Sequence, residues 1–380
     1  MSSEEIGVAD AFRRLQLHLN TMPVGYPATE SGVEIRLLKR LFTPEEAEIA
    51  GVLSFAPESA KKVARRAKKL GLSEEEVSQR LDAMVAKGVI HGGQNTDTGE
   101  MLYGAAPLLV GFFNYQAGHL TADLVADFDE YADTAFFDAE WVKTLPQLRT
   151  IPAEQSIKVN QVVEWRNEVA AYDDISKLVE NARPPYVVLD CTCRQMKEIE
   201  GTPCTHSREV CLRFASGARW YLSLGIGREI SKEEVVAILQ KAQEEGLILQ
   251  PYNAQRPIGI CCCCGDACLI LTRLKKYPRP ADLVASNYYV QTETDKCTGC
   301  GACMDRCQMD AIELEGVSRT NLERCIGCGA CVPTCPENAR HLVKKEVEWV
   351  PTVKAEELYM EIMKQKAKLA TQSNERKFTP

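Results

Sequence analysis

Apolar residues recur with helical spacing through much of the first hundred residues. In GVEIRLLKRLF, four of them fall near one face of a predicted helix: Val33, Leu37, Leu38 and Leu41. A second helix is expected over PESAKKVARRAKKLG, ending at Gly71, and a third over SEEEVSQRLDAMVAKGV. Ser73 and Glu76 have the spacing of a capping box at the start of the third helix. Its buried stripe is predicted to be Val77, Leu81, Met84 and Val85.

The stretch IHGGQNTDTGEMLYG follows these helices and predicts a β-hairpin with a glycine-rich loop. Three helices and a hairpin resemble a winged helix, which we assign to residues 32–105, after an N-terminal arm over 1–31. The resemblance makes DNA binding a candidate function of this domain. The helix that would read the bases opens with Glu74, Glu75 and Glu76, however, and the DNA backbone would repel these carboxylates. The second helix is strongly basic, with Lys61, Lys62, Arg65, Arg66, Lys68 and Lys69. We therefore favour protein docking for this domain, or merely a solvated basic face on that helix.

The rest of the chain predicts further helices and strands. AAPLLVGFF (105–113) is much shorter than the roughly 20 residues of a membrane span, so we expect a buried strand or core segment, and no membrane span. Residues 106–155 are predicted to be a helical extension. In 156–285, YDDISKLVENARPPYVVLDCTCR and SKEEVVAILQKAQEEGLILQPYN each predict a helix and then a strand, with Ser231 capping the second helix. A helical, partly flexible tail is expected over 346–380, and the predicted fold class is α+β.

Of all features of the composition, the number and placement of the cysteines say most about the function. A net charge of -8 argues against general nucleic-acid binding, and the first residues contain no apolar signal segment, so we expect a cytoplasmic protein. The chain nevertheless contains 17 cysteines, none before Cys191 and none after Cys335. Disulfides are rare in the cytosol, and an odd number of cysteines cannot all pair within one chain. Metal ligation is the better explanation.

Two cysteine motifs of identical spacing form an internal duplication. CTGCGACMDRC (297–307) and CIGCGACVPTC (325–335) both have the pattern C-x2-C-x2-C-x3-C, and each cysteine of the second lies 28 positions after its counterpart. Gly299, Gly301 and Ala311 recur at the same offset. Four thiolates can serve a four-iron cluster, and glycine lets the backbone pass close to its sulfides. Zinc sites do not use this spacing.

These motifs resemble a bacterial-type ferredoxin with two [4Fe–4S] clusters over residues 286–345. The resemblance implies that one cluster is held by Cys297, Cys300, Cys303 and Cys335. It implies that the other is held by Cys325, Cys328, Cys331 and Cys307. The proline that follows the fourth cysteine in the family is present as Pro336 but replaced by Gln308 in the first copy, a departure that concerns the local turn and not the ligation.

Nine further cysteines flank the predicted helix and strand at 231–250. Neighbours on an extended strand face opposite sides, so alternating cysteines of CCCC (261–264) could serve two sites. Cys264 and Cys268 could share a site if a helix begins at Gly265. We expect one or two additional [4Fe–4S] clusters, while one cluster with free thiols, or a zinc ion, stays open. The candidate ligands are Cys191, Cys193, Cys204, Cys211, Cys261, Cys263, Cys264 and Cys268.

Polar residues lie close in sequence to these candidates: Asp190, Arg194, His206 and Asp266. A ligand other than cysteine would leave an iron open to substrate, whereas the alternative is hydrogen bonding to the ligands or a surface position. No catalytic residue is assigned.

The segments CTCR (191–194) and CCGDAC (263–268) resemble multi-domain ferredoxin-like proteins of anaerobes. That resemblance implies electron transfer in anaerobic metabolism, as a carrier or a subunit of a larger oxidoreductase, with redox proteins as partners. A redox enzyme with a catalytic cluster in 156–285 and a redox-sensing DNA-binding regulator are the alternatives.

Overall fold

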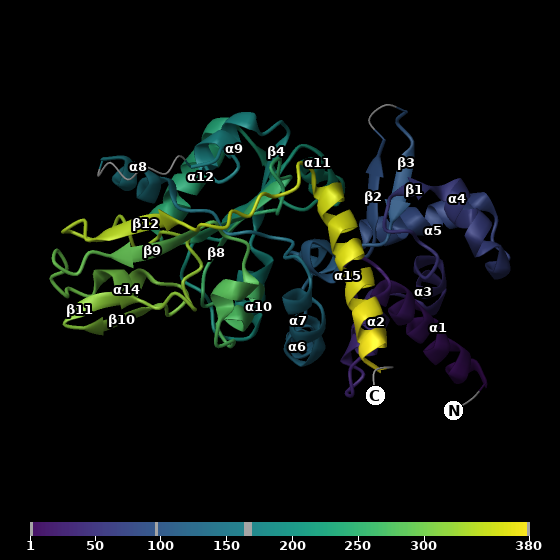
Figure 1. Cartoon of the computed structure of the whole chain (residues 1–380). Coiled ribbons are helices and arrows are strands. Elements are labelled where there is room, and N and C mark those ends of the chain that lie inside the picture. The colour runs from purple at the N-terminus through teal and green to yellow at the C-terminus, as the bar shows by residue number, and fades with distance from the viewer. Residues whose placement is uncertain (1–2, 96–97, 163–168, 378–380) are drawn as a thin grey trace.

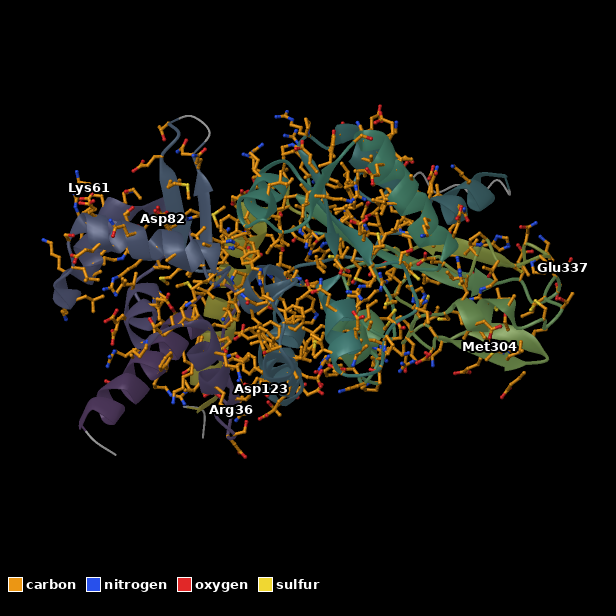
Figure 2. The ribbon with its side chains drawn as sticks, turned by 180° about the vertical axis from the view of Figure 1, so that it is seen from behind. Arg36, Lys61, Asp82, Asp123, Met304 and Glu337 are labelled. Atoms are coloured by element: carbon orange, nitrogen blue, oxygen red, sulfur yellow. The ribbon has the colours of Figure 1, made fainter. Side chains whose placement is uncertain are left out.

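The computed structural model describes residues 3–95, 98–162 and 169–377, and it is α+β, as the sequence predicts. In Figure 1, the N-terminal helices gather at one end of the molecule, a five-stranded sheet lies in the middle, and the strands that carry the duplicated motif form the other end. Figure 2 shows the same division from behind, with Lys61 at one end and Met304 and Glu337 at the other.

The N-terminal part combines helices with a small antiparallel sheet of order β1-β3-β2. Its elements are α1 (Ser3–Asn20), α2 (Val33–Leu41), α3 (Pro44–Ala50), β1 (Glu58–Ser59), α4 (Ala60–Arg66), η1 (Ala67–Leu70), α5 (Glu74–Ala86), β2 (His91–Gln94) and β3 (Met101–Gly104). The segment expected to be an arm contains α1, whose Phe12 and Leu15 are buried. Helix α3 was not predicted, although Thr43 and Glu46 form a capping box at its start.

The local signals of this part are confirmed. Ser73 accepts a hydrogen bond from the backbone N–H of Glu76, and the Glu76 side chain accepts one from the backbone N–H of Ser73. Gly71 ends η1 in the left-handed conformation with a φ of 70°. The residues predicted to face inward are all buried, namely Val33, Leu37, Leu38, Leu41, Val77, Leu81, Met84 and Val85.

The apolar run at 105–113 is a buried core segment, and the alternative expectation of a strand there is wrong. Leu109 is extended, whereas Val110 has a φ of 58°, so the backbone turns within η2 (Leu108–Phe112). The extension continues through η3 (Asn114–Gln116), α6 (Ala122–Tyr131), η4 (Ala132–Phe136), α7 (Phe137–Ala139) and η5 (Trp141–Lys143). Helix α6 packs on α2, where Asp127 forms ion pairs with Arg36 and Arg40.

The middle of the molecule is a sheet of order β6-β4-β5-β8-β7 in which all paired strands are antiparallel. Its strands are β4 (Tyr186–Asp190), β5 (Glu209–Phe214), β6 (Arg228–Ile230), β7 (Ile248–Pro251) and β8 (Gly259–Cys263). The helices are α8 (Glu154–Val162), α9 (Ile175–Asn181), α10 (Thr192–Ile199), α11 (Ala215–Ser223), α12 (Lys232–Glu244) and α13 (Leu269–Leu274). Both predicted pairs of helix and strand, α9 with β4 and α12 with β7, are confirmed, as is the cap at Ser231.

The C-terminal part begins after η6 (Pro280–Leu283) and consists of two antiparallel strand pairs. Strand β9 (Tyr288–Thr292) pairs with β12 (Arg340–Lys344), and β10 (Ile312–Glu315) pairs with β11 (Val317–Thr320), next to α14 (Ala302–Arg306).

Helix α15 (Ala355–Lys377) returns along the molecule to the N-terminal end, as the yellow helix of Figure 1 shows. Lys366 forms an ion pair with Glu140 at 3.1 Å, and the rings of Tyr359 and Phe55 lie 4.7 Å apart between centroids. In the described part of the chain, no helix has the length and apolar character that crossing a bilayer requires.

Candidate functional site

The two duplicated loops require glycine at matching positions. Gly299 and Gly327 have φ values of 69° and 71°, in the region that side chains disfavour. A Cβ at Gly299 would lie 2.2 Å from the carbonyl oxygen of Gly316, and one at Gly327 would lie 2.1 Å from that of Tyr288. Each loop is therefore wrapped tightly against a neighbouring strand or turn.

The eight cysteines of the duplication line two pockets. The first pocket, of about 310 Å³ including open solvent, contains Cys297, Cys300, Cys303 and Cys335. The second, of about 360 Å³ by the same measure, contains Cys307, Cys325, Cys328 and Cys331. Each motif thus contributes its first three cysteines to one pocket and its fourth to the other. These are the two groupings that the ferredoxin resemblance implies.

Backbone amides point at several of these sulfur atoms. The amides of Ala311 and Ala339, which correspond in the duplication, donate to the Sγ atoms of Cys307 and Cys335 at 3.3 and 3.2 Å. The amide of Ser318 donates to Sγ of Cys297 at 3.3 Å and thereby lowers the pKa of that thiol. Such donors stabilise negative charge on sulfur.

Arg340 on β12 lies between the two pockets and lines both of them. It is 1% exposed, and its guanidinium donates to the hydroxyls of Thr292, Ser318 and Thr320 and lies 3.8 Å from Sγ of Cys303. Its Nε has no hydrogen-bond partner, and no carboxylate forms an ion pair with it among the described residues. An anionic group in these pockets would compensate the buried charge.

Six of the remaining cysteines form a ring of thiols at one end of the central sheet. Cys211 on β5 lies directly opposite Cys261 on β8, and Cys263 faces the same side two residues later. Cys191 follows β4, Cys193 lies in the first turn of α10, and Cys268 caps α13. Neighbouring thiols interact in the order Cys191, Cys193, Cys268, Cys263, Cys261 and Cys211, and back to Cys191.

The pKa values around this six-cysteine ring shift in alternating directions. Hydrogen bonds from neighbouring thiols lower the pKa values of Cys191, Cys261 and Cys268. The thiols that donate these bonds have raised pKa values: Cys193, Cys211 and Cys263. Because the thiols lie close together, they cannot all ionise without a cation to compensate them.

The ring surrounds a pocket of about 600 Å³, again including open solvent, which Cys262, Cys264 and Arg194 also line. Leu109, Phe113 and Tyr252 provide much of its apolar wall. Arg213 also lines it, 1% exposed, with its guanidinium carbon 4.9 Å and 5.3 Å from the ring centroids of Tyr221 and Tyr252. Its Nε has no hydrogen-bond partner, and the described chain offers it no ion pair.

Cys262 lies on the other face of β8, and Cys264, just after the end of β8, is buried in the same second apolar core. Cys262 is buried in the second apolar core, where burial raises its pKa; the set of eight candidate ligands excludes it. The Sγ of Cys264 lies 3.7 Å from that of Cys204. The two thiols of Cys264 and Cys268 therefore join different groups, because α13 begins at Leu269 and not at Gly265.

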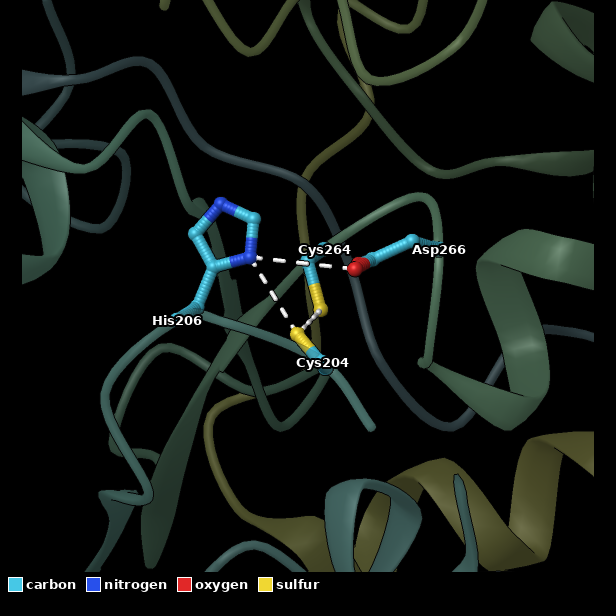
Figure 3. Close-up of side chains that lie close together, drawn as sticks. All are labelled: Cys204, His206, Cys264 and Asp266. Carbon is cyan, nitrogen blue, oxygen red and sulfur yellow. Dashed lines mark hydrogen bonds and ion pairs between the residues drawn. The ribbon is translucent and has the colours of Figure 1, made fainter. Parts of the chain in front are cut away.

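His206 and Asp266 complete the cluster around Cys204 and Cys264, as Figure 3 shows. The four potential ligand atoms all lie within 4.8 Å of one another. Of the other two polar residues noted from the sequence, Asp190 forms an ion pair with Arg208 at 2.8 Å, whereas Arg194 donates to Sγ of Cys264 at 3.3 Å.

A direct contact joins the ring region to the duplicated motif. The amide of Gly265, just after the four consecutive cysteines, donates to Oε1 of Gln308 at 2.8 Å. A Cβ at Gly265 would lie 2.0 Å from the carbonyl oxygen of Gln308, so the two backbones touch. Gln308 stands where the second copy has Pro336, and proline has no side-chain acceptor for this bond. The departure from the family pattern thus coincides with this interface.

Arg213 and Arg340 are functional candidates that were not predicted from the sequence. The only available signal was an arginine inside an apolar strand, as in EVCLRF (209–214), where a charged side chain needs a buried partner.

Comparison with known proteins bears on the duplicated motif alone. Residues 296–339 match the family described as 4Fe-4S dicluster domain. The chain therefore carries an iron–sulfur domain of the ferredoxin type, with at least one [4Fe–4S] cluster, in a role consistent with electron transfer. No curated protein and no solved structure matches the chain.

Proposed function

We propose that this protein transfers electrons through two [4Fe–4S] clusters in the duplicated motif and a third iron–sulfur centre in the six-cysteine pocket. The observation that carries the proposal is that buried arginines without carboxylate partners in the described structure line all three thiol pockets: Arg340 the first two and Arg213 the third. Thiolate-ligated iron–sulfur clusters are anionic and would compensate these cations.

In this proposal Cys297, Cys300, Cys303 and Cys335 hold one cluster, and Cys307, Cys325, Cys328 and Cys331 hold the second. When bound, such clusters accept and release single electrons. The protein contributes the donors to sulfur, the buried cations and the contact between Gly265 and Gln308, which links the loop of Cys307 to the ring.

The partner is proposed to be a redox protein that docks at the end opposite the N-terminal helices. Cys300 is exposed, and Met304, which follows Cys303 in the sequence and lies at that end (Figure 2), is 41% exposed. An exposed apolar side chain next to a ligand of the first pocket offers a short route for an electron. Nucleic acid is a poorer candidate, because the first turn of α5 exposes Glu74, Glu75 and Glu76.

Metal analysis of anaerobically purified protein tests the proposal. Two clusters alone require about eight irons per chain, whereas a third [4Fe–4S] cluster raises the count to about twelve. Cys211→Ala, which opens the ring, is expected to remove only the additional iron. Cys262→Ala is the matched control, because it removes a neighbouring buried cysteine that lies outside the ring. A count of eight in the wild-type protein would contradict the third centre, and fewer than eight would contradict the two-cluster motif.

A redox enzyme is the second candidate, because the ring has more thiols than the four that a cubane uses, and its pocket has an apolar wall. Small substrates that reach the pocket are expected to change the electron paramagnetic resonance spectrum of the third centre alone. If electrons pass quickly to a partner and no added small molecule perturbs that spectrum, the carrier role is favoured over this second candidate.

A further inference from the structure

We propose that Cys204, His206, Cys264 and Asp266 form a mononuclear zinc site, whose two thiols are neither members of the six-cysteine ring nor part of the duplicated motif. The four side chains come from two loops, one between α10 and β5 and the other between β8 and α13. Figure 3 shows them converging on a common centre.

The distances between donor atoms suit a tetrahedral ion. Two Zn–S bonds of about 2.3 Å would put the sulfurs about 3.8 Å apart, and the Sγ atoms of Cys204 and Cys264 are 3.7 Å apart. Nδ1 of His206 lies 3.2 Å from Sγ of Cys204 and 3.9 Å from Oδ2 of Asp266. Because all four donors lie within 4.8 Å of one another, they enclose room for one ion and not for a four-iron cluster.

The ligand chemistry selects the metal. Calcium and magnesium prefer oxygen ligands, whereas two thiolates, an imidazole and a carboxylate are typical zinc donors. Binding would release the two thiol protons to solvent and leave the site with one excess negative charge.

Arg194, which also lines the six-cysteine pocket, supports an anionic centre here through its contacts with both loops. It is 1% exposed and, within the residues described, forms no ion pair; its Nε has no hydrogen-bond partner. Its guanidinium donates to Sγ of Cys264 at 3.3 Å and to the carbonyl oxygen of Ser207, in the loop of His206. The buried cation therefore contacts a ligand from one loop and the backbone of the other, and it would compensate the charge of the site.

The proposed ion would clamp the two loops together beside the ring. Gly265 lies between the two ligands of the second loop, and its amide contacts Gln308. The site would therefore fix the position of the joint between the six-cysteine ring and the duplicated motif, and its role would be structural.

Zinc analysis of full-length protein, produced anaerobically with zinc in the medium, tests the site. About one zinc per chain is expected alongside the iron, with two sulfur neighbours at about 2.3 Å and two nitrogen or oxygen neighbours in zinc-edge X-ray absorption. Cys204→Ser and His206→Ala are expected to lower zinc at least fivefold while the iron count stays unchanged. Cys262→Ala serves as the control that keeps both metals.

Cys204→Ser and His206→Ala would also lose zinc if they failed to fold, so His206→Cys is the second test. It replaces one zinc donor by another and should retain the ion with three sulfur neighbours. Three results would overturn the proposal: wild-type protein without zinc, a zinc shell of four sulfurs, or loss of about four irons in Cys204→Ser, which would assign these thiols to a cluster. None of these results affects the two proposed clusters of the duplicated motif. The zinc site can therefore be refuted while the proposed electron-transfer function stands.

Discussion

Arg340 places a buried positive charge between two pockets that are each lined by four cysteines. A cation about 6 Å from a cluster, at an effective dielectric constant of about 20, stabilises an added electron by on the order of 100 mV. Arg340→Gln is therefore expected to lower the reduction potentials of both proposed clusters by about that amount, as measured by anaerobic redox titration. Arg319→Gln, which removes an exposed charge from β11, should leave them nearly unchanged. Equal shifts in the two variants would contradict a local effect.

His91 on β2 makes the stability of the fold depend on pH. It lies against Trp220, its Nδ1 is 2.8 Å from the hydroxyl of Tyr115, and burial lowers its pKa to about 4. In the unfolded chain the pKa of histidine is about 6.5, so between these values the unfolded state binds more protons. The contribution of this group to the free energy of unfolding is fully present above pH 6.5 and is lost as pH falls toward 4.

His91→Gln should remove this dependence. From pH 7.5 to pH 5 the wild-type protein is expected to lose about 2 kcal/mol more stability than the variant. Chemical unfolding followed by tryptophan fluorescence at the two pH values measures the difference. His119→Gln, at an exposed position, is the control and should behave like the wild type. Parallel losses in wild type and His91→Gln would show that another group is responsible.

At the scale of single residues, the sequence predicts the role of a side chain when its partners lie nearby in the sequence. Ser73 and Ser231 cap helices because the hydroxyl and the amide that it accepts from are three residues apart or fewer. Arg213 and Arg340 face thiols that lie elsewhere in the chain, and nothing beside them in sequence identifies those partners.

At the scale of elements, the loop after β8 contacts the loop of Cys307 so closely that Gly265 has no room for a side chain. Gly265→Ala would place a methyl group 2.0 Å from the carbonyl oxygen of Gln308. We expect a destabilisation of about 1–3 kcal/mol and slower electron exchange between the proposed third centre and the proposed clusters of the duplicated motif. Gly93→Ala, which meets no atom within 4 Å, is the matched control. Unchanged exchange kinetics in Gly265→Ala would show that electrons do not cross here.

The strands show why the nine central cysteines could not be divided from sequence alone. Alternation along β8 separates Cys261 and Cys263 from Cys262 and Cys264, and a period of two predicts that much. The pairing of Cys211 with Cys261 depends on the strand order and register. Whether Cys268 joins Cys264 depends on where α13 begins, and the chain has no strong capping signal there.

At the scale of the whole molecule, α15 connects the C-terminal end to the N-terminal helices. Ile362 is completely buried, whereas the adjacent Met363 is 42% exposed. Ile362→Ala is expected to cost about 2–5 kcal/mol and to make the N-terminal part more susceptible to limited proteolysis, while Met363→Ala should change neither by much. Identical thermal unfolding of the two variants would contradict a structural role for this helix. The sequence predicts the helix itself, but its destination depends on contacts such as that of Tyr359 with Phe55.

The path of α15 also sets an order of assembly. During synthesis, the ribosome releases this helix after every one of the 17 cysteines, yet its partners Phe55 and Glu140 were made long before. The N-terminal part therefore lacks this covering helix until all 17 cysteines have been synthesised. Iron can bind to the cysteines before α15 packs against its partners. The packing of α15 can then be the last folding step, on a chain that already contains its iron.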